Sequence, residues 1–159
     1  MTHRILIMGL PGAGKTTLAR ALQRKLNAMW FNADDIRKQY NDWDFSLKGR
    51  IRQSSRMRNL ADESGAKYVL VDFVCPLPEM REIFDAHTTV WVDTIIEGRF
   101  EDTNRMFVPP DRWDFRVTEQ NAEHWTNLIL SQINNTNSLN SCGGLHGNNT
   151  TATSTNSSW

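Results

Sequence analysis

Residues 9–16, Gly-Leu-Pro-Gly-Ala-Gly-Lys-Thr, have the composition and spacing of a phosphate-binding loop between a strand and a helix. The glycines let the backbone curl so that several N–H groups face one anion-sized hollow, and the following helix directs its positive end to the same place. Lys15 adds a positive charge for the β- and γ-phosphates, and the Thr16 hydroxyl is suited to ligate Mg²⁺. The pattern predicts nucleotide binding, with ATP and Mg²⁺ as cofactors. The residues expected at the nucleotide are Gly9, Gly12, Ala13, Gly14, Lys15, Thr16 and Thr17.

Acidic residues follow the next two candidate strands, at the edge of the sheet where ligands gather in parallel α/β proteins. Asp34 comes just after the second strand, and its carboxylate could accept a proton from an acceptor hydroxyl. Arg37, three residues on, would share a helix face with Asp34 and could clamp an anionic substrate. Asp72 ends the apolar run 69–71, a position typical of a carboxylate in a Mg²⁺ shell. The alternatives are a helix cap for Asp34 and a plain strand end for Asp72.

Arginines and one aromatic residue widen the candidate site. Arg50 could be a second anion clamp. Arg99 and Arg105, in the irregular segment after the fourth strand, are candidate lid arginines for the nucleotide, with a surface charge as the alternative. Phe45, in a polar loop, could stack on a planar substrate or simply pin the loop to the core. Cys75 is interpreted as a small buried hydrophobe and not as a nucleophile.

The positions of these residues depend on a series of apolar runs that are interpreted as strands. The runs are mostly continuous, which is typical of strands buried on both faces of a parallel sheet. Strands are expected at residues 4–8, 28–31, 68–74, 88–92 and 115–117. The β-α-β order at the start implies right-handed crossovers between parallel strands. We therefore predict a three-layer α/β/α fold with a parallel, roughly five-stranded sheet.

Helical periodicity and composition define the rest of the chain. Helices are expected at residues 15–26, from 32–35 onward, and at 50–63, 79–86 and 118–133, the last capped by Thr118. The segment 94–113 has weak periodicity and would cover the site. From Asn134 the chain is mostly Asn, Ser, Thr and Gly, which cannot offset the entropy of ordering. We expect one domain at residues 1–133 and a disordered, low-complexity tail at 134–159.

Composition excludes several classes of protein. Lys+Arg and Asp+Glu are both 18, so the chain lacks the excess positive charge of a broad nucleic-acid surface, and nucleic acid is expected only as a kinase substrate. No apolar run approaches the roughly 20 residues of a membrane span, and the first residues are interpreted as a strand and not as a signal peptide. The two cysteines have neither zinc-type spacing nor a disulfide framework. A reduced, cytoplasmic setting without a membrane partner is expected.

Three stretches, spread from residue 4 to about 133, resemble the adenylylsulfate kinase family of the P-loop NTPase superfamily. The first, GLPGAGKTTLARAL, is shared with many phosphotransferases. The second, FNADDIRKQYNDWDFSLKGRIRQSSRM, is similar to the family's Asp-Gly-Asp-Asn-x-Arg cluster, Asn-bearing loop, Phe-Ser pair and Arg-led helix. The third, FVCPLPEMREIF, is similar to the family's Phe-Ile-Ser-Pro segment. The resemblance implies that MgATP phosphorylates the 3′-hydroxyl of adenosine 5′-phosphosulfate.

The resemblance also implies roles for individual residues. Asp34 would be the general base, Arg37 and Arg50 would bind the phosphosulfate, and Phe45 would stack on the substrate adenine. The catalytic residues are then Lys15 and Asp34, the metal ligands are Thr16 and Asp72, the nucleotide ligands include Arg99, and the substrate ligands are Asp34, Arg37, Phe45, Arg50 and Phe73.

The chain departs from this family at several positions. Asn32 and Ala33 replace the first Asp-Gly of the cluster, Gln53 stands near a family Asn, and Cys75 replaces the Ser before the proline. The lid segment GRFEDTNRMFVPPDRWDF lacks the lysines of the family's Lys-Gly-Leu-Tyr-Lys-Lys motif. Substrate contacts from that region therefore do not carry over.

Two other interpretations compete with this one. Residues 32–37, Asn-Ala-Asp-Asp-Ile-Arg, also resemble the Asn-x-Asp-Asp-x-Arg of polynucleotide 5′-kinases, which would give Asp34 and Arg37 the same roles with another acceptor. A nucleotide-dependent switch or ATPase would instead leave both residues without a substrate. The Phe-Ser pair with its Arg-led helix and the Phe-Val-Cys-Pro segment favour the adenylylsulfate interpretation. We expect an ATP-dependent kinase of a small, anionic, hydroxyl-bearing substrate, and a homodimer stays open.

Overall fold

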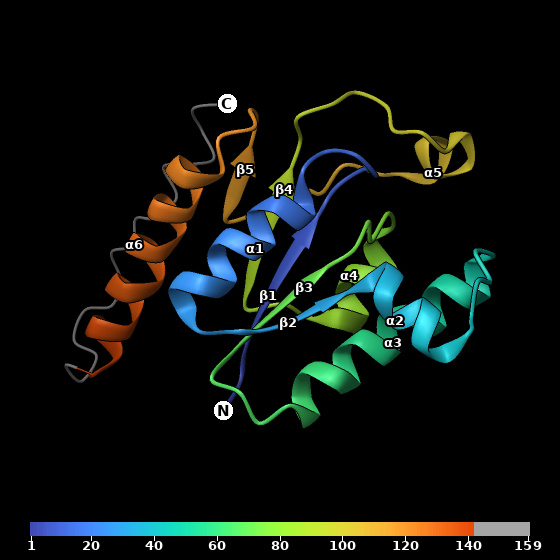
Figure 1. Cartoon of the computed structure of the whole chain (residues 1–159). Coiled ribbons are helices and arrows are strands. Elements are labelled where there is room, and N and C mark those ends of the chain that lie inside the picture. Colours follow the sequence, from blue (N-terminus) through green and yellow to red (C-terminus); the bar gives the residue numbers. More distant parts are fainter. Residues whose placement is uncertain (142–159) are drawn as a thin grey trace.

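The computed structural model describes residues 1–141 of the chain, and its centre is a sheet of five parallel strands (Figure 1). The strands are β1 (His3–Met8), β2 (Met29–Asn32), β3 (Tyr68–Asp72), β4 (Thr88–Val92) and β5 (Phe115–Val117). Their order across the sheet is β2-β3-β1-β4-β5, and all neighbouring pairs are parallel. The last two strands have the predicted bounds, and the first three differ from prediction by one or two residues at their ends.

Helices cover both faces of this sheet, with α1 and α6 together on one face and α3 and α4 on the other (Figure 1). The helices are α1 (Lys15–Leu26), α2 (Ala33–Tyr40), α3 (Leu47–Glu63), α4 (Pro78–Phe84), α5 (Glu101–Met106) and α6 (Ala122–Ser141). The arrangement is a three-layer α/β/α fold, which confirms the predicted fold class. No helix within residues 1–141 is both long and apolar enough to cross a membrane.

The central strand β1 explains why its sequence is apolar without alternation. Ile5 and Ile7 point into the core beneath α1 and α6, whereas Leu6 and Met8 point into the core beneath α3 and α4. Both faces of the strand are therefore buried, as expected for the middle of a parallel sheet. The predicted stripe of α6 lies in the first of these cores, where it contributes Trp125, Ile129 and Ile133.

Helix α6 differs from the prediction at both ends. The side chain of Asn121, and not that of Thr118, caps it by accepting a hydrogen bond from the His124 backbone N–H at 3.2 Å. The helix continues to Ser141, beyond the expected end at residue 133, and the Asn137 side-chain amide donates a hydrogen bond to the Tyr68 hydroxyl. The rest of the predicted tail, residues 142–159, lies outside the described residues.

Two helices near the candidate site also differ from the prediction: α3 begins earlier than expected, and α5 was not predicted. Helix α3 begins at Leu47 instead of Arg50, because the Ser46 hydroxyl accepts a hydrogen bond from the Gly49 N–H at 3.2 Å and caps the helix. The segment 94–113, expected to be irregular, contains the short helix α5.

The buried stripe of α6 leads to a stability prediction. Trp125 is fully buried between α6 and the sheet, so Trp125→Ala should lower the free energy of unfolding by about 3–5 kcal/mol. Leu128, on the same helix, is 37% exposed, so Leu128→Ala should cost about 1 kcal/mol or less. Urea unfolding followed by circular dichroism measures both values. Equal losses would contradict the packing of α6 described above.

Candidate active site

The loop between β1 and α1 turns on three glycines with left-handed backbone conformations. Their φ angles are +151° at Gly9, +91° at Gly12 and +108° at Gly14. A Cβ atom at Gly9 would lie 2.4 Å from the carbonyl oxygen of Val92 at the end of β4, so this close approach requires glycine. Gly14 caps α1 without a side chain, which leaves the first N–H groups of the helix available to an anion.

Lys15 is the first residue of α1, and its side chain folds back over the loop. Its Nζ atom donates a hydrogen bond to the carbonyl oxygen of Leu10 at 3.1 Å. Burial lowers the pKa of Lys15, the negative charges of Asp72 and Asp34 raise it, and the positive charge of Arg99 lowers it again. The ammonium group therefore lies in the electrostatic field of two carboxylates, and it is held by a neutral carbonyl that a phosphate oxygen could replace.

A cavity of about 840 Å³ lies at the carboxyl ends of β1, β2 and β3. It brings together twelve of the residues predicted from the sequence, namely Gly12, Gly14, Lys15, Thr16, Thr17, Asp34, Arg37, Phe45, Arg50, Asp72, Phe73 and Arg99. Gly9 and Ala13 are buried and do not line it. The cavity thus joins the phosphate-binding loop to the residues expected at the acceptor.

Asp72, at the end of β3, is a buried carboxylate with defined partners. It is 2% exposed and accepts hydrogen bonds from the Trp30 indole N–H at 2.8 Å and from the Asn32 side-chain amide at 3.1 Å to each oxygen. Burial raises the pKa of Asp72, and these hydrogen bonds and Lys15 partly oppose the shift. Asp72 is therefore more than a polar residue at the end of a strand, because three hydrogen bonds fix its carboxylate.

The residues expected to bind Mg²⁺ fit that ion chemically. The Thr16 hydroxyl and the Asp72 carboxylate both line the cavity, and oxygen atoms are the ligands that Mg²⁺ prefers. Mg²⁺ commonly takes one or two protein ligands and completes its shell with water and substrate phosphates. Two protein oxygens beside a phosphate-binding loop are therefore sufficient for a site of this kind.

Asp34 lies in the first turn of α2 with its side chain exposed and lining the cavity. The cap of this helix is Asn32, whose Oδ1 accepts a hydrogen bond from the Asp35 backbone N–H at 3.1 Å. The alternative in which Asp34 caps the helix is therefore wrong. Because the Asn32 amide also donates to Asp72, one side chain links the start of α2 to the end of β3.

Arg37 is 4% exposed and is held by the loop of residues 41–46 between α2 and α3, here called the α2–α3 loop. Its Nη1 atom donates hydrogen bonds to the carbonyl oxygens of Asp42 at 2.9 Å and Asp44 at 3.1 Å. Its guanidinium carbon lies 4.2 Å from the centroid of the Phe45 ring, a cation–π distance. The ring is 49% exposed, so Phe45 contacts arginine and still offers surface to the cavity.

Arg50 connects the α2–α3 loop to α5. Its Nε atom donates to the carbonyl oxygen of Phe45 at 2.8 Å, and Nη2 donates to the Thr103 hydroxyl at 3.4 Å. Burial lowers the pKa of Arg50, and the charge of Asp102 in α5 raises it.

Arg99 is exposed and lines the cavity, whereas Arg105 pairs with Glu101 at 3.7 Å and does not line it. Of the two lid candidates, only Arg99 therefore faces the site.

The segment that carries α5 is attached at both ends. Near its start, Gly98 lies so close to Pro11 of the phosphate-binding loop that a Cβ would come within 2.9 Å of the Pro11 carbonyl oxygen. At its end, the Val108 N–H donates to the carbonyl oxygen of Pro76 at 2.8 Å. Arg81 of α4 donates to the same Pro76 oxygen at 3.1 Å. The segment thus spans the cavity between two loops.

Phe73 and Cys75 lie in the loop after β3. Phe73 is buried, lines the cavity and packs edge-on against Phe84 of α4, with ring centroids 5.9 Å apart. Cys75 is fully buried with a φ of +49°, and Arg81 donates to its carbonyl oxygen at 3.0 Å. Burial raises the pKa of the Cys75 thiol, in agreement with the predicted buried hydrophobe.

Sequence reasoning missed several cavity residues. Trp43, Gln53 and Thr103 line the cavity, and only Gln53 stood out in the sequence, as a departure from a family pattern. A second, smaller cavity of about 200 Å³ lies behind the phosphate-binding loop, where residues 119–122 approach Thr17. The short stretch between β5 and α6 has no motif that would predict this hollow.

The parallel sheet, the phosphate-binding loop and the cavity beside it define a protein of the P-loop kinase fold. The sequence profile of the family described as "AAA domain" matches residues 5–101, more than half of the chain. The chain therefore belongs to this family.

Kinases are among the proteins most similar to this chain. Shikimate kinases from strains of Legionella pneumophila are 27% identical over 112 residues, a match that covers 65% of this chain and 64% of each relative. The structure of the APS kinase of Mycobacterium tuberculosis in complex with AMPPNP and APS has a TM-score of 0.71 at 19% identity and covers 84% of this chain and 98% of that one. The shikimate kinase of Acinetobacter baumannii in complex with shikimate has a TM-score of 0.59 at 20% identity, with coverages of 86% and 95%.

The burial of Asp72 leads to a prediction on stability and pH. Because its folded-state pKa is raised, the stability that this group contributes is present at low pH and is lost as the pH rises through that pKa. Asp72→Asn removes the buried charge and keeps an acceptor for Trp30, so the variant should melt above wild type at about pH 7. The difference should shrink towards about pH 4.

Thermal unfolding followed by circular dichroism at the two pH values measures this difference. The matched control is Asp34→Asn, which removes an exposed carboxylate of the same cavity and should leave the melting temperature unchanged. A lower melting temperature for Asp72→Asn at neutral pH would show that its ionised form stabilises the fold.

Proposed function

We propose that the protein is an ATP-dependent kinase that phosphorylates a hydroxyl group of a small anionic acceptor, and that this acceptor is adenosine 5′-phosphosulfate. The observation that carries the proposal is the single cavity that joins the phosphate-binding loop to Asp34, Arg37 and Arg50. Its volume of about 840 Å³ is within the range of small-molecule sites and leaves room for an acceptor beside the phosphates of ATP. The similar proteins named above are kinases of small molecules, which supports the same class.

On the donor side, the N–H groups of the loop and Lys15 would bind the β- and γ-phosphates, as the buried position of Lys15 supports. Thr16 and Asp72 would hold Mg²⁺, which, when bound, neutralises part of the charge on these phosphates. Arg99, exposed at the cavity, would contact the transferred phosphoryl group from the α5 side. Displacing Lys15 from the Leu10 carbonyl costs one hydrogen bond to a neutral acceptor and yields one to a negatively charged phosphate oxygen.

On the acceptor side, the exposed carboxylate of Asp34 would accept the proton of the attacking hydroxyl. The acceptor oxygen forms a bond to the γ-phosphorus while the bond from that phosphorus to the bridging oxygen breaks, and ADP leaves. Arg37 and Arg50 would bind the anionic group of the acceptor and so place its hydroxyl in line. Catalysis of this kind rests on positioning and electrostatics more than on covalent chemistry.

The aromatic wall of the cavity favours adenosine 5′-phosphosulfate over other anionic alcohols. Phe45 presents a half-exposed ring beside two arginines, an arrangement that suits a planar base attached to a charged group. Shikimate is the second candidate, because the curated relatives carry its name and its carboxylate would also pair with arginine. Shikimate has no planar aromatic ring for Phe45, so the exposed ring does not support it.

A side-by-side assay tests the acceptor. The protein is incubated with MgATP and, in turn, adenosine 5′-phosphosulfate, shikimate or a 5′-hydroxyl oligonucleotide, and the phosphorylated product is measured. The expected result is product with adenosine 5′-phosphosulfate alone. Product with only one of the other two would overturn the proposed acceptor. ATP hydrolysis that none of the three changes would overturn the kinase assignment and support a nucleotide-dependent switch or ATPase.

Lys15 gives a prediction for the chemical step. Lys15→Ala should lower kcat by at least about 100-fold, because in the proposed mechanism its charge would stabilise the negative charge that develops on the phosphates. The melting temperature should change little, since the only hydrogen bond that the Lys15 side chain makes within residues 1–141 goes to the Leu10 carbonyl. The control Lys25→Ala removes an exposed lysine from the other end of α1 and should leave kcat unchanged. Full activity of Lys15→Ala would remove the basis of the proposed function.

A further inference from the structure

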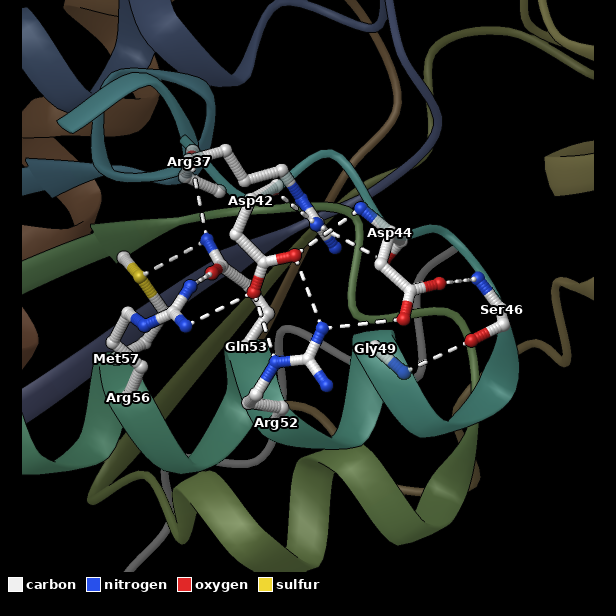
Figure 2. A network of polar contacts seen from close by, with 10 residues as sticks. Arg37, Asp42, Asp44, Ser46, Gly49, Arg52, Gln53, Arg56 and Met57 are labelled. Atoms are coloured by element: carbon white, nitrogen blue, oxygen red, sulfur yellow. Dashed lines mark hydrogen bonds and ion pairs between the residues drawn. The ribbon is translucent and has the colours of Figure 1, made fainter. Parts of the chain in front are cut away.

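The α2–α3 loop is fastened to α3 by a network of charged side chains (Figure 2). The Asp42 carboxylate accepts hydrogen bonds from Arg52 at 2.9 and 3.1 Å and from Arg56 at 3.0 Å. The Asp44 carboxylate accepts a further bond from Arg52 at 3.2 Å. Two carboxylates and two guanidinium groups cancel in charge, so this network adds no net charge beside the cavity.

The network continues from α3 to the start of α2. Arg56 donates to the Gln53 side-chain oxygen at 2.8 Å (Figure 2), and the Gln53 amide donates to the carbonyl oxygen of Ala33 at 3.1 Å. Ala33 directly precedes the proposed base, Asp34. The loop, the middle of α3 and the first residue of α2 are therefore held in one connected set of hydrogen bonds.

The backbone of the same loop holds the residues proposed to bind the acceptor. The carbonyl oxygens of Asp42 and Asp44 accept both hydrogen bonds of the Arg37 Nη1 atom, and the carbonyl of Phe45 accepts from Arg50. These carbonyl oxygens can accept hydrogen bonds from Arg37 and Arg50 only while the loop keeps this conformation. The side chain of Asp42 points to α3 while its carbonyl points to Arg37, so one residue connects the two sets of contacts (Figure 2).

We propose that Asp42 is a positioning residue for the acceptor: it does not line the cavity, and it fixes the loop whose carbonyls orient Arg37 and whose aromatic ring covers that arginine. This inference rests on the proposed function, because it assigns Arg37 to the acceptor. The Asp42 and Arg56 side chains are 13% and 15% exposed and the Arg52 side chain is 47% exposed, so the network lies at the edge of the protein surface. Hydrogen bonds from Arg52 and Arg56 hold the pKa of Asp42 far below its usual range, so the carboxylate is ionised under assay conditions.

A positioning role and a merely stabilising role predict different results. Ion pairs near a surface contribute little to global stability, so loss of Asp42 should change the melting temperature only slightly. A misplaced binding group, in contrast, weakens binding of the ligand it should contact. Asp42→Asn keeps the shape of the side chain and removes its charge, and therefore separates these two effects.

The first measurement is hydrogen–deuterium exchange of the full-length protein without ligands. Asp42→Asn should speed exchange of the amides in the α2–α3 loop and leave those of β1 and β3 as in wild type. The matched control is Glu63→Gln, which removes an exposed carboxylate from the same helix α3 and should leave all of these amides unchanged. This readout is independent of the acceptor. Unchanged exchange in the loop of Asp42→Asn would overturn the positioning role, even if every kinase assay supports the proposed function.

The second measurement is steady-state kinetics with adenosine 5′-phosphosulfate. Asp42→Asn should raise the KM for this acceptor about tenfold or more, while the KM for ATP and the kcat at saturating acceptor stay within about twofold of wild type. Asp42→Glu should recover part of the loss. An unchanged acceptor KM, or equal losses for both substrates, would overturn the proposal. If wild type binds no acceptor, the proposed function fails, and the exchange data alone decide on the loop.

A double-mutant comparison shows whether Asp42 acts through Arg37. In an Arg37→Ala background the loop can act on the acceptor only through Arg50 and Phe45, so Asp42→Asn should raise the acceptor KM by clearly less than it does in wild type. A second rise of similar size would show that the two residues act independently and would overturn the proposed route. Calorimetric titration with adenosine 5′-phosphosulfate gives the same comparison without turnover.

Discussion

The close approach of Gly9 to the end of β4 is the constraint on which the site depends. The backbone leaves β1 and passes within contact distance of the Val92 carbonyl, which leaves no room for a side chain. That turn brings the N-terminus of α1 to the edge of the sheet, where the carboxyl ends of β2 and β3 also lie. With a bulkier residue at this point, the loop could not close over the sheet, and Lys15 would not reach the cavity.

Charge is distributed unevenly along the cavity that results. Lys15 lies near Asp72 and Asp34 at the end next to the phosphate-binding loop, whereas Arg37 and Arg50 lie at the other end with their nearest polar partners mostly backbone carbonyls. Carbonyl groups orient an arginine without neutralising it. The far end of the cavity therefore holds two guanidinium groups whose direct hydrogen bonds go to neutral oxygen atoms, even though the chain has no net charge.

The sequence predicted the sheet well because each strand is buried on both faces and its apolar run is unbroken, as Ile5–Met8 illustrate. It predicted the cavity residues that follow strands for the same reason, since the carboxyl ends of parallel strands meet at one edge. Helix ends were less predictable. Thr118 and Asn121 are both good caps, and only the path of the chain after β5 selects Asn121.

Contacts across irregular segments could not be predicted from the sequence. The pairing of Asp42 with Arg52 and Arg56 spans ten and fourteen residues through a loop without periodicity, and charged residues in such a stretch look like a solvated surface. Thr103 was missed because α5 is only six residues long and lacks an apolar stripe. Arg37 and Phe45 were both selected, but nothing in their spacing indicated that one would stack on the other.

The attachment of the α5 segment at Gly98 and Val108 has a mechanical consequence. A segment that contacts its neighbours at one end alone can swing open as a flap, whereas contacts at both ends, as here, make such a swing break one of them. The cavity is therefore bordered on this side by a segment that contacts a loop at each end, the phosphate-binding loop near Pro11 and the loop after β3 near Pro76.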